Sequence, residues 1–379
     1  MRSGLLLATL PLRDVSMSQV IKGAAAGSAV VPLTDRVLRR DPFRATVQRR
    51  TCMWAERQEV EPGGRVVDSV IPWAGIVMKR TRKRAGRSMS LDLVTWESYW
   101  NRRIAGSRVF TQADRFVIMR QLATWAATQP DGVVMPHLAP TVAAGNLSGD
   151  LMDRTYDAAL QKPILEAATQ LGNAGDGFDW RLVPYRDTDA NATFRVRLDL
   201  GYPRLGRVAP ADLLWSDADN DTRAGQLLDY SLTEDGSAVD NVTTALGKGS
   251  GPTQLRSTIS AAAVGRDEVG AYGYPVYEGT LGGSTSELET QDALDRHARG
   301  AMLAGLASEV RLSGIEVRGD LAPTLGRYLV GDDGTFRLAS STTGQPVTIV
   351  GQIIGRTIKP GQPGRTERVT MDVQGTVAA

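Results

Sequence analysis

One stretch of the chain decides the fold: RSMSLDLVTWESYWNRRIAGSRVFTQADRFVIMRQLATWA, residues 87–126. Polar and apolar residues alternate over Ser88–Thr95, which is the pattern of a half-buried β-strand. An aromatic and basic turn, Trp96–Arg103, follows directly. Thr111–Asp114 then predicts the start of an amphipathic helix, because capping residues precede large apolar residues at helical spacing. The apolar side of that helix holds Phe116, Ile118, Met119, Leu122 and Trp125.

The composition is that of a multidomain globular protein. At 379 residues the chain is too long for one ordinary core and predicts two to four domains. Forty glycines and many Asp, Asn and Ser clusters indicate numerous turns, hence a β-rich chain. A formal charge of only +2 argues against a surface built to neutralise a nucleic-acid backbone. The single cysteine, Cys52, excludes an intrachain disulfide framework and a Cys-based zinc site.

The order of patterns along the chain is β, α, β, α, β. Strand patterns include an antiparallel pair at 178–184 and 193–200, a second pair at 227–233 and 241–246, and a closing hairpin at 349–372. A short strand is also expected at 327–330. The predicted units are an N-terminal arm (1–34), a first β-barrel (35–95), an inserted α/β domain (96–200), the first part of a second β-barrel (201–285), a helical insertion (286–314) and closing strands (315–379).

The first 34 residues predict an arm that orders only against a neighbour. Their Gly and Ala content and two prolines disfavour a self-contained fold, yet many of their side chains are too apolar to remain in water. The candidate interface residues are Leu5, Leu6, Leu7, Leu10 and Leu12. The apolar run 4–12 is far shorter than the ~20 residues of a membrane span, and Pro11 within it argues against a signal peptide. We therefore expect folding and assembly in a bacterial cytoplasm.

No motif assembles a catalytic or metal site. The two histidines, His137 and His297, lack companions at ligand spacing. The acidic run 217–221 resembles the opening of a calcium loop but lacks its glycine and its bidentate glutamate, so a solvated turn is the simpler interpretation. Gly331–Gly334 is interpreted as a hairpin turn, and the glycine-rich runs 201–207 and 247–251 as loops. We expect no enzyme activity, no cofactor and no metal.

Two basic clusters remain, and a solvated hairpin tip is the simplest interpretation of them. The alternative is a positive rim that faces an acidic partner or DNA passing through a pore. The residues concerned are Lys79, Arg80, Arg82, Lys83, Arg84, Arg102 and Arg103.

Several motifs, in this order and spacing, resemble those of the minor tail, or tail-hub, proteins of siphoviruses, the long-tailed phages, that infect actinobacteria. They are Arg36–Phe43 as an opening strand ending in Asp-Pro-aromatic, Leu91–Arg103, Thr111–Asp114 with Ile118–Ala126, the Pro-Arg-x-Gly turn within Leu198–Arg207, and Leu227–Gly249. The arm and the loop at 132–150 depart from that pattern.

The resemblance implies a structural virion protein with an α+β, β-rich fold. That fold has two tail-tube-type β-barrel or sandwich domains with inserted helical α/β domains, as in phage baseplate hub proteins. A ring, commonly a homotrimer, would join the tail tube to the distal tail protein and other tip proteins. It would surround the tape-measure protein and the exit pore for phage DNA at the tail tip of the virion.

Two other functions stay open at this point. A receptor- or glycan-binding tail protein would use exposed aromatic side chains as stacking platforms. The candidates are Trp54, Trp73, Trp96, Trp100, Tyr272, Tyr274 and Tyr277, although aromatics inside strand patterns more often belong to a core. A cell-wall hydrolase is the third possibility, and peptidoglycan zymography separates it from the other two.

Overall fold

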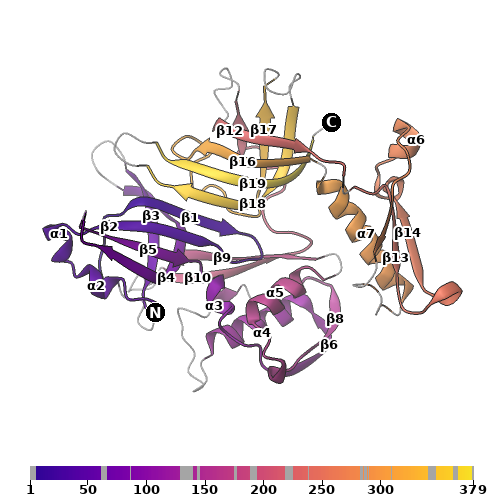
Figure 1. Ribbon diagram of the computed structural model, residues 1–379, viewed down its shortest axis with the longest axis horizontal. Coiled ribbons are helices and arrows are strands. Elements are labelled where there is room, and N and C mark those ends of the chain that lie inside the picture. The colour runs from indigo at the N-terminus through magenta and orange to yellow at the C-terminus, as the bar shows by residue number, and fades with distance from the viewer. Residues whose placement is uncertain are drawn as a thin grey trace.

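The computed structural model centres on a large mixed sheet that joins strands from both ends of the chain (Figure 1). The sheet has 11 strands in the order β17-β11-β12-β16-β19-β18-β1-β2-β5-β4-β3. The structure describes residues 6–60, 66–85, 87–128, 140–142, 146–174, 177–187, 194–217, 225–237, 239–281, 285, 288, 290–308, 310–339, 347–361 and 366–377. Leu5, His137 and the turn at 61–65 lie outside these ranges, as do most of the loop at 132–150 and of the acidic run 217–221.

Six of these strands close into a barrel, because β17 pairs with β18 as well as with β11. The strands are β11 (Leu214–Ser216), β12 (Gly225–Glu234), β16 (Val310–Arg318), β17 (Asp333–Leu338), β18 (Val347–Lys359) and β19 (Arg368–Val377). The expected closing hairpin is confirmed as the antiparallel pair β18–β19. The expected strand at 327–330 is wrong, since these residues form a loop that leads into β17.

The other half of the sheet contains five strands from the N-terminal quarter of the chain. They are β1 (Arg13–Val20), β2 (Ala26–Pro32), β3 (Cys52–Val60), β4 (Val66–Lys83) and β5 (Ser88–Val94). The Ser88 strand is confirmed, with Met89, Leu91 and Leu93 buried on one face. The two strands expected between Val66 and Arg82 are one continuous strand, β4.

The arm expected at 1–34 is wrong for residues 13–32, which form β1 and β2 in the middle of the sheet. The β1 strand pairs with β18, and β2 pairs with β5. Gly27 of β2 has no side chain where the indole of Trp73 lies against the strand, and the Trp73 Nε1 donates to the Ser18 carbonyl of β1 (2.9 Å). A Cβ at Gly27 would sit 3.0 Å from that ring. Burial of Met17 and Val31 stabilises this arrangement by roughly 1.5–3 kcal/mol for each side chain.

The opening strand expected at Arg36–Phe43 is also wrong, because two helical turns occupy this segment. They are α1 (Asp35–Leu38) and α2 (Pro42–Ala45). The Asp-Pro pair explains the second turn. The Asp41 side chain accepts a hydrogen bond from the Arg44 amide, and Pro42 occupies the first helical position, where a missing N–H costs nothing.

The inserted region has its own apolar core beneath the sheet. Its elements are α3 (Glu97–Trp100), β6 (Arg108–Asp114), α4 (Arg115–Ala127), β7 (Thr141–Val142), β8 (Leu151–Tyr156), η1 (Ala158–Leu160), α5 (Ile164–Gly172), β9 (Asp179–Arg186) and β10 (Phe194–Gly201). The pairing of β9 with β10 is confirmed. The first long helix begins later than expected, since β6 continues to Asp114, whose carboxylate caps α4 by accepting from the Phe116 amide (2.8 Å).

A small α/β module lies beside the barrel, and its helix α7 is the element nearest to the barrel strands (Figure 1). Its elements are β13 (Val242–Leu246), η2 (Gly251–Thr253), β14 (Arg256–Ser260), η3 (Ala261–Val264), α6 (Glu268–Tyr272), β15 (Glu278–Leu281) and α7 (Gln291–Ser308). The pair expected between 227–233 and 241–246 is wrong. The first segment is β12 of the barrel, and the second is β13, which pairs with β14 and β15.

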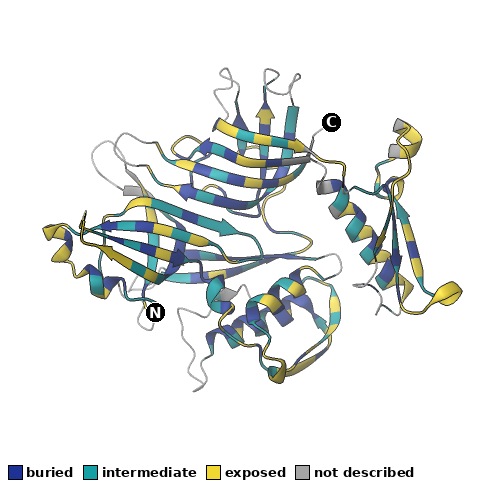
Figure 2. Cartoon of the chain, viewed as in Figure 1, coloured by how far each residue is buried: buried dark blue, intermediate teal, exposed yellow. Residues whose placement is uncertain are grey.

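Burial alternates along the strands of the large sheet, as the period of two requires (Figure 2). One apolar cluster fills the barrel and the adjoining five strands, a second fills the inserted region, and two small ones lie under α7. The β-rich α+β class expected from the sequence is confirmed.

Candidate assembly interface

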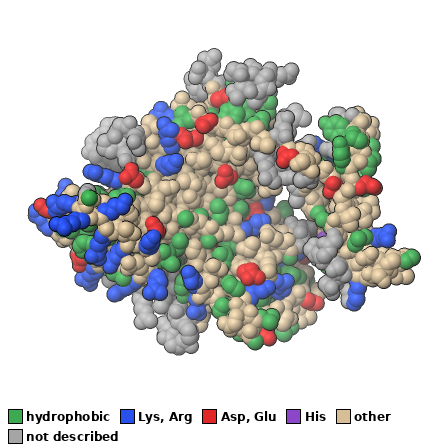
Figure 3. Space-filling view, viewed as in Figure 1, with side chains coloured by type: hydrophobic (Ala, Val, Ile, Leu, Met, Phe, Trp, Pro, Cys, Tyr) green, Lys and Arg blue, Asp and Glu red, His purple; other side chains and the backbone are tan. Residues whose placement is uncertain are grey.

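The basic residues of the first cluster lie at the α1–α2 end of the sheet, where Lys and Arg side chains gather on the surface (Figure 3). Arg80 has a structural role, because its Nη1 donates to the carbonyl oxygen of Phe43 (2.6 Å). The guanidinium carbon of Arg82 lies 4.4 Å from the centroid of the Phe43 ring. Lys83 and Arg84 are exposed at the end of β4. Lys79 is also exposed, 3.7 Å from the carboxylate of Asp92.

We call residues 35–50 and 79–87 the basic tip. These two segments hold twelve Lys and Arg residues against two Asp residues, a formal charge of +10. The whole chain carries +2, so the remaining residues together carry −8. The local pattern indicates a basic cluster at 79–84 only, and the fold brings 35–50 alongside it. Arg80 donates to the carbonyl of Phe43, and Arg87 pairs with Asp35 at 2.8 Å.

The second basic pair belongs to a different part of the molecule. Arg103 donates from its Nη2 to the carbonyl oxygens of Trp125 and Thr128, the residues that end α4. A cation at this end of a helix satisfies terminal carbonyls and the helix dipole. Arg102 is exposed. The structure therefore explains Arg103 within the fold and does not bring it to the basic tip.

The candidate apolar interface residues divide into two groups. Leu6 and Leu7 are exposed, at 68% and 55% of their surface. Leu10 and Leu12 instead pack against the main core. Only the segment before Leu10 thus remains a candidate for contact with a neighbour.

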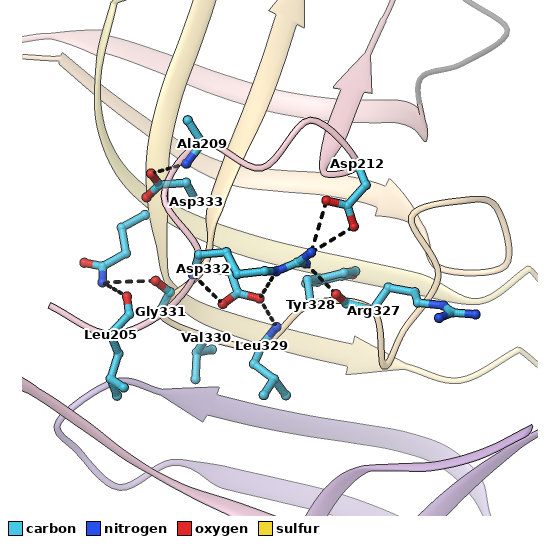
Figure 4. Close-up of polar contacts among 12 residues, drawn as sticks. Leu205, Ala209, Asp212, Arg327, Tyr328, Leu329, Val330, Gly331, Asp332 and Asp333 are labelled. Atoms are coloured by element: carbon cyan, nitrogen blue, oxygen red, sulfur yellow. Dashed lines mark hydrogen bonds and ion pairs between the residues drawn. The ribbon is translucent and has the colours of Figure 1, made fainter. Parts of the chain in front are cut away.

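A buried ionic network, which the sequence analysis missed, holds the loop before β17 (Figure 4). Asp333 is 2% exposed and accepts from both terminal nitrogens of Arg204, at 2.6 and 2.7 Å. The amide of Ala209 donates to the same carboxylate (2.8 Å). Asp332, also buried, accepts from the backbone amides of Arg207 and Leu329, both at 3.1 Å. The interpretation of Gly331–Gly334 as a hairpin turn is wrong, because β17 already begins at Asp333 and a loop, not a strand, precedes it.

The loop at 201–209 fits this network only because Gly206 has no side chain. Its φ is +93°, and a Cβ would lie 2.1 Å from the carbonyl oxygen of Gly331. Gln352 of β18 donates from Nε2 to the carbonyls of Leu205 and Gly331, both at 3.2 Å. The barrel strand and the two loops are therefore joined at one point.

The same point anchors the inserted region and the N-terminal strands. Gln352 also donates to Asp179 at 2.7 Å, and Lys22 lies 3.2 Å from that carboxylate. On β9, Arg181 donates to the Val330 carbonyl and to Asp199 (3.2 Å). Strands β9 and β18 thus contact residues 330–331 directly, and the turn after β1 joins them through Asp179.

Arg356 of β18 is the largest of the deeply buried charged side chains among the residues that the structure describes. It is 2% exposed and donates to the side chain of Gln19 (2.8 Å) and to the carbonyls of Tyr328 (2.8 Å) and Pro72 (3.2 Å). Burial lowers the pKa of Arg356 to about 10 and raises the pKa of the Tyr328 phenol to about 12. At neutral pH Arg356 remains a cation held by three neutral acceptors.

Unlike Asp332 and Asp333, Glu97 at the start of α3 is a buried carboxyl without an ion pair to any described cation. Burial raises the pKa of its carboxyl to about 7, and hydrogen bonds from the Thr95 side chain and the Leu182 backbone only partly oppose this shift. Burial raises the pKa of the Cys52 thiol to about 12, so the thiol is protonated at neutral pH. His297 lies half-buried on α7 with its Nδ1 2.9 Å from the Ala293 carbonyl.

Within the described ranges, no three His, Cys, Asp or Glu side chains are grouped so that they could hold a metal ion. No described helix is long and apolar enough to cross a membrane. Of the candidate stacking aromatics, Trp73, Trp96 and Trp100 are buried, and Trp54 stacks on Phe194. Tyr274 and Tyr277 are exposed on the module, at 50% and 57%. The Tyr272 side chain lies outside the described part.

Comparison with solved structures places this fold among phage tail proteins. No protein-family model and no curated protein matches the chain. A tail protein from Neisseria meningitidis is similar over 95% of this chain and 91% of its own, with a TM-score of 0.56 and 13% identity. The 43 kDa tail protein of prophage MuSo2 from Shewanella oneidensis is similar over 95% and 92%, with a TM-score of 0.54 and 10% identity.

A chain of the Francisella PdpA–VgrG complex is also similar, with a TM-score of 0.51 and 9% identity over 97% of this chain and 54% of that one. At such low identity the likeness is one of fold. The β-rich chain, with its six-stranded barrel, its adjoining strands and its few helices, shares its fold with these tail proteins.

Proposed function

We propose that this protein forms the hub ring at the tail tip of a long-tailed phage of actinobacteria. The ring, a homotrimer, joins the tail tube to the distal tail protein and other tip proteins. It surrounds the tape-measure protein and then the DNA that leaves the virion, and it assembles in the host cytoplasm. The observation that carries the proposal is the tail-protein fold extending over 95% of the chain.

The proposed role is mechanical and needs a rigid joint between domains. The buried contacts of Arg356, Gln352 and Asp333 supply such a joint, because each ties a barrel strand to a different segment of the chain. Buried polar groups that are fully paired resist rearrangement, since breaking them leaves charges without partners.

The sheet also has a feature that favours a ring. Strand β3 (Cys52–Val60) is the last strand at one edge and pairs only with β4 among the described strands. An exposed edge of this kind invites pairing with another chain, and lateral contacts around a closed ring cover it.

Electron microscopy of isolated tail tips tests the proposal. Phage particles carrying an affinity label on this chain should show the label at the tip, three copies per particle, at the end of the tail tube. Deletion of the gene should yield tails that lack tip proteins. Label elsewhere on the virion, or wild-type tips in the deletion mutant, would refute the proposal.

A receptor- or glycan-binding role is favoured by one observation, the exposure of Tyr274 and Tyr277. Labelled protein should then bind host cell walls, and Tyr277→Ala should abolish binding. Particles lacking the protein that still adsorb normally would exclude this role. A clear zone in peptidoglycan zymography would instead indicate a cell-wall hydrolase.

A further inference from the structure

The basic tip carries more positive charge than its own neighbours neutralise. Among the ion pairs between described residues, two involve cations of the tip at the surface, Arg87 with Asp35 and Lys79 with Asp92. All four side chains are 60% exposed or more, so these pairs contribute little. Arg36, Arg39, Arg44, Lys83 and Arg84 are exposed as well. A surface this basic repels a copy of itself and favours an acidic partner.

The tip also offers apolar contact. Leu38 of α1 is 39% exposed, and Leu6 and Leu7 are exposed on the segment that Arg40 holds through the carbonyl of Thr9. Arg accounts for most of the tip's charge, and Arg beside apolar groups is the composition of a protein–protein interface. A purely electrostatic surface for a nucleic-acid backbone needs no such leucines.

A complementary surface lies on the module at the other end of the molecule's long axis (Figures 1 and 3). We call residues 267–278 the α6 face. It exposes Val269 (40%), Tyr274 (50%), Val276 (55%) and Tyr277 (57%). Asp267 and Glu278 are exposed beside them. Residues 234–309, which include this face, hold eleven acidic residues against five Lys and Arg, a formal charge of −6.

The two surfaces match in chemistry. Tyr rings accept Arg guanidinium groups on their faces, and carboxylates pair with them at the edge. Arg and Tyr are the side chains that most often carry the binding energy of an interface. The basic tip and the α6 face are different patches at opposite ends of one chain, so both can be engaged at once by neighbouring copies (Figure 1).

We propose that the basic tip of one copy of this chain docks on the α6 face of the next copy. The contact is head-to-tail and heterologous, so it closes into a ring or continues as a filament according to the angle between copies. It deepens the proposed ring function by naming the two surfaces that meet, and it rests on that function only for closure of the ring. A symmetric tip-to-tip contact would place +10 against +10 and is disfavoured.

Charge exchange between two variants tests the contact in the full-length protein. Variant one carries Arg82→Glu and Arg84→Glu on the tip; variant two carries Glu278→Arg on the α6 face. Sedimentation velocity at low salt should show wild-type oligomers. These should dissociate near 1 M salt, because the Debye length there is only about 3 Å and the charges of the two surfaces are screened from each other. Each variant alone should raise the dissociation constant about tenfold or more. Thermal melts confirm that each variant is folded.

Mixing the two variants is the decisive experiment. Each contact between unlike variants is either wild-type tip on wild-type α6 face or reversed tip on reversed face. A closed trimer of the two variants has two such contacts and one contact between like variants, so the mixture should associate more tightly than either variant alone but less tightly than the wild type. A matched control, Arg256→Glu with Arg299→Glu on the module, changes charge by the same amount as variant one at exposed sites outside both surfaces and should associate normally.

Three outcomes overturn the inference. The wild type could remain monomeric at every concentration, the reversed variants could associate as well as the wild type, or the mixture could fail to recover association. Salt-sensitive binding of short duplex DNA that Arg82→Glu with Arg84→Glu abolishes, without any change in self-association, would assign the tip to nucleic acid instead. Label at the tail tip alongside normal association of the variants would leave the hub function standing while this contact fails.

Discussion

The guanidinium of Arg356 lies 5.5 Å from the centroid of the Tyr328 ring and donates to that residue's own carbonyl oxygen at 2.8 Å. One arginine on β18 thus fixes the loop before β17. Through Gln19 and Pro72 it also fixes β1 and β4. This single side chain is where the closed barrel and the N-terminal strands are held together.

Replacing Arg356 should therefore be severe. Arg356→Met keeps the aliphatic length but leaves the carbonyls of Pro72 and Tyr328 and the side chain of Gln19 without donors. We expect a loss of about 3–5 kcal/mol in the free energy of unfolding, measured by urea denaturation. Arg356→Lys should recover little of it, because an ammonium group cannot reach three acceptors in a fork. Equal stability of wild type and Arg356→Met would contradict this assignment.

Two carboxylates near Arg207 should differ sharply in how much their loss destabilises the protein. Asp332 is buried and accepts from two backbone amides, whereas Asp212 pairs with the Arg207 side chain at 2.9 Å and is 62% exposed. Asp332→Ala should cost about 2–4 kcal/mol and Asp212→Ala less than about 1 kcal/mol in the free energy of unfolding. If the two substitutions cost the same, the buried network does not stabilise the loop as described.

The stability of the protein should decline as pH rises through the range set by Glu97. Its carboxyl has a pKa of about 7 in the folded protein and an ordinary value of 4.5, so the folded state binds the proton more tightly. The contribution of Glu97 to the free energy of unfolding is therefore greatest below about pH 4.5 and falls between about pH 4.5 and 7. Above about pH 7 the free energy of unfolding stays lower by up to about 3 kcal/mol. Glu97→Gln should remove this slope and stabilise the protein at pH 8, in denaturation curves recorded across the range.

Truncation separates the exposed N-terminal residues from the strands that follow them. Deletion of residues 2–7 removes Leu6 and Leu7 but leaves β1 intact, so the protein should stay folded and soluble. Deletion of residues 2–34 removes both strands between β18 and β5 and uncovers Trp73, so it should yield insoluble or unfolded chains. Circular dichroism and gel filtration of the two truncations decide this. A well-folded 2–34 deletion would restore the detachable-arm hypothesis.

Gly206 should tolerate no side chain. With φ at +93° and the Gly331 carbonyl oxygen 2.1 Å from where a Cβ would lie, Gly206→Ala must displace the loop that carries Arg204 and Arg207. We expect a loss of at least about 2 kcal/mol in thermal denaturation. Gly236→Ala, where nothing lies within 4 Å of the added carbon, serves as the control and should be nearly neutral.

The sequence predicted best those elements whose period is set by their own residues. The strand at Ser88–Val94 and the helices at Ile164–Gly172 and Gln291–Ser308 lie where alternation or helical spacing indicates them. The N-terminal strands were not predicted, because Gly27 has no side chain where Trp73 of β4 lies against it, a contact that no local pattern reveals.

The candidate surfaces were predicted only in part for a similar reason. The sequence shows that Lys79–Arg84 is basic. That this segment lies beside α1 depends on how β4 and β5 pair within the sheet. The Asp332–Asp333 pair looks like a turn in sequence. Its burial follows from Arg204, which lies 129 residues earlier in the chain. Charges buried by distant partners leave no local signal in a single sequence.

Strand β18 belongs to both halves of the large sheet, and this determines when the N-terminal strands can complete their pairing. Its first residues pair with β17, and Gly355–Ile358 pair with β1. Ser18 and Thr357, which meet across the second pairing, are 339 residues apart in the sequence. While the ribosome is still making the chain, β1 and β2 have emerged but the strand beside β1 does not exist. The N-terminal strands must wait for β18 with one edge unpaired, so the nascent chain is exposed to aggregation until β18 has been made.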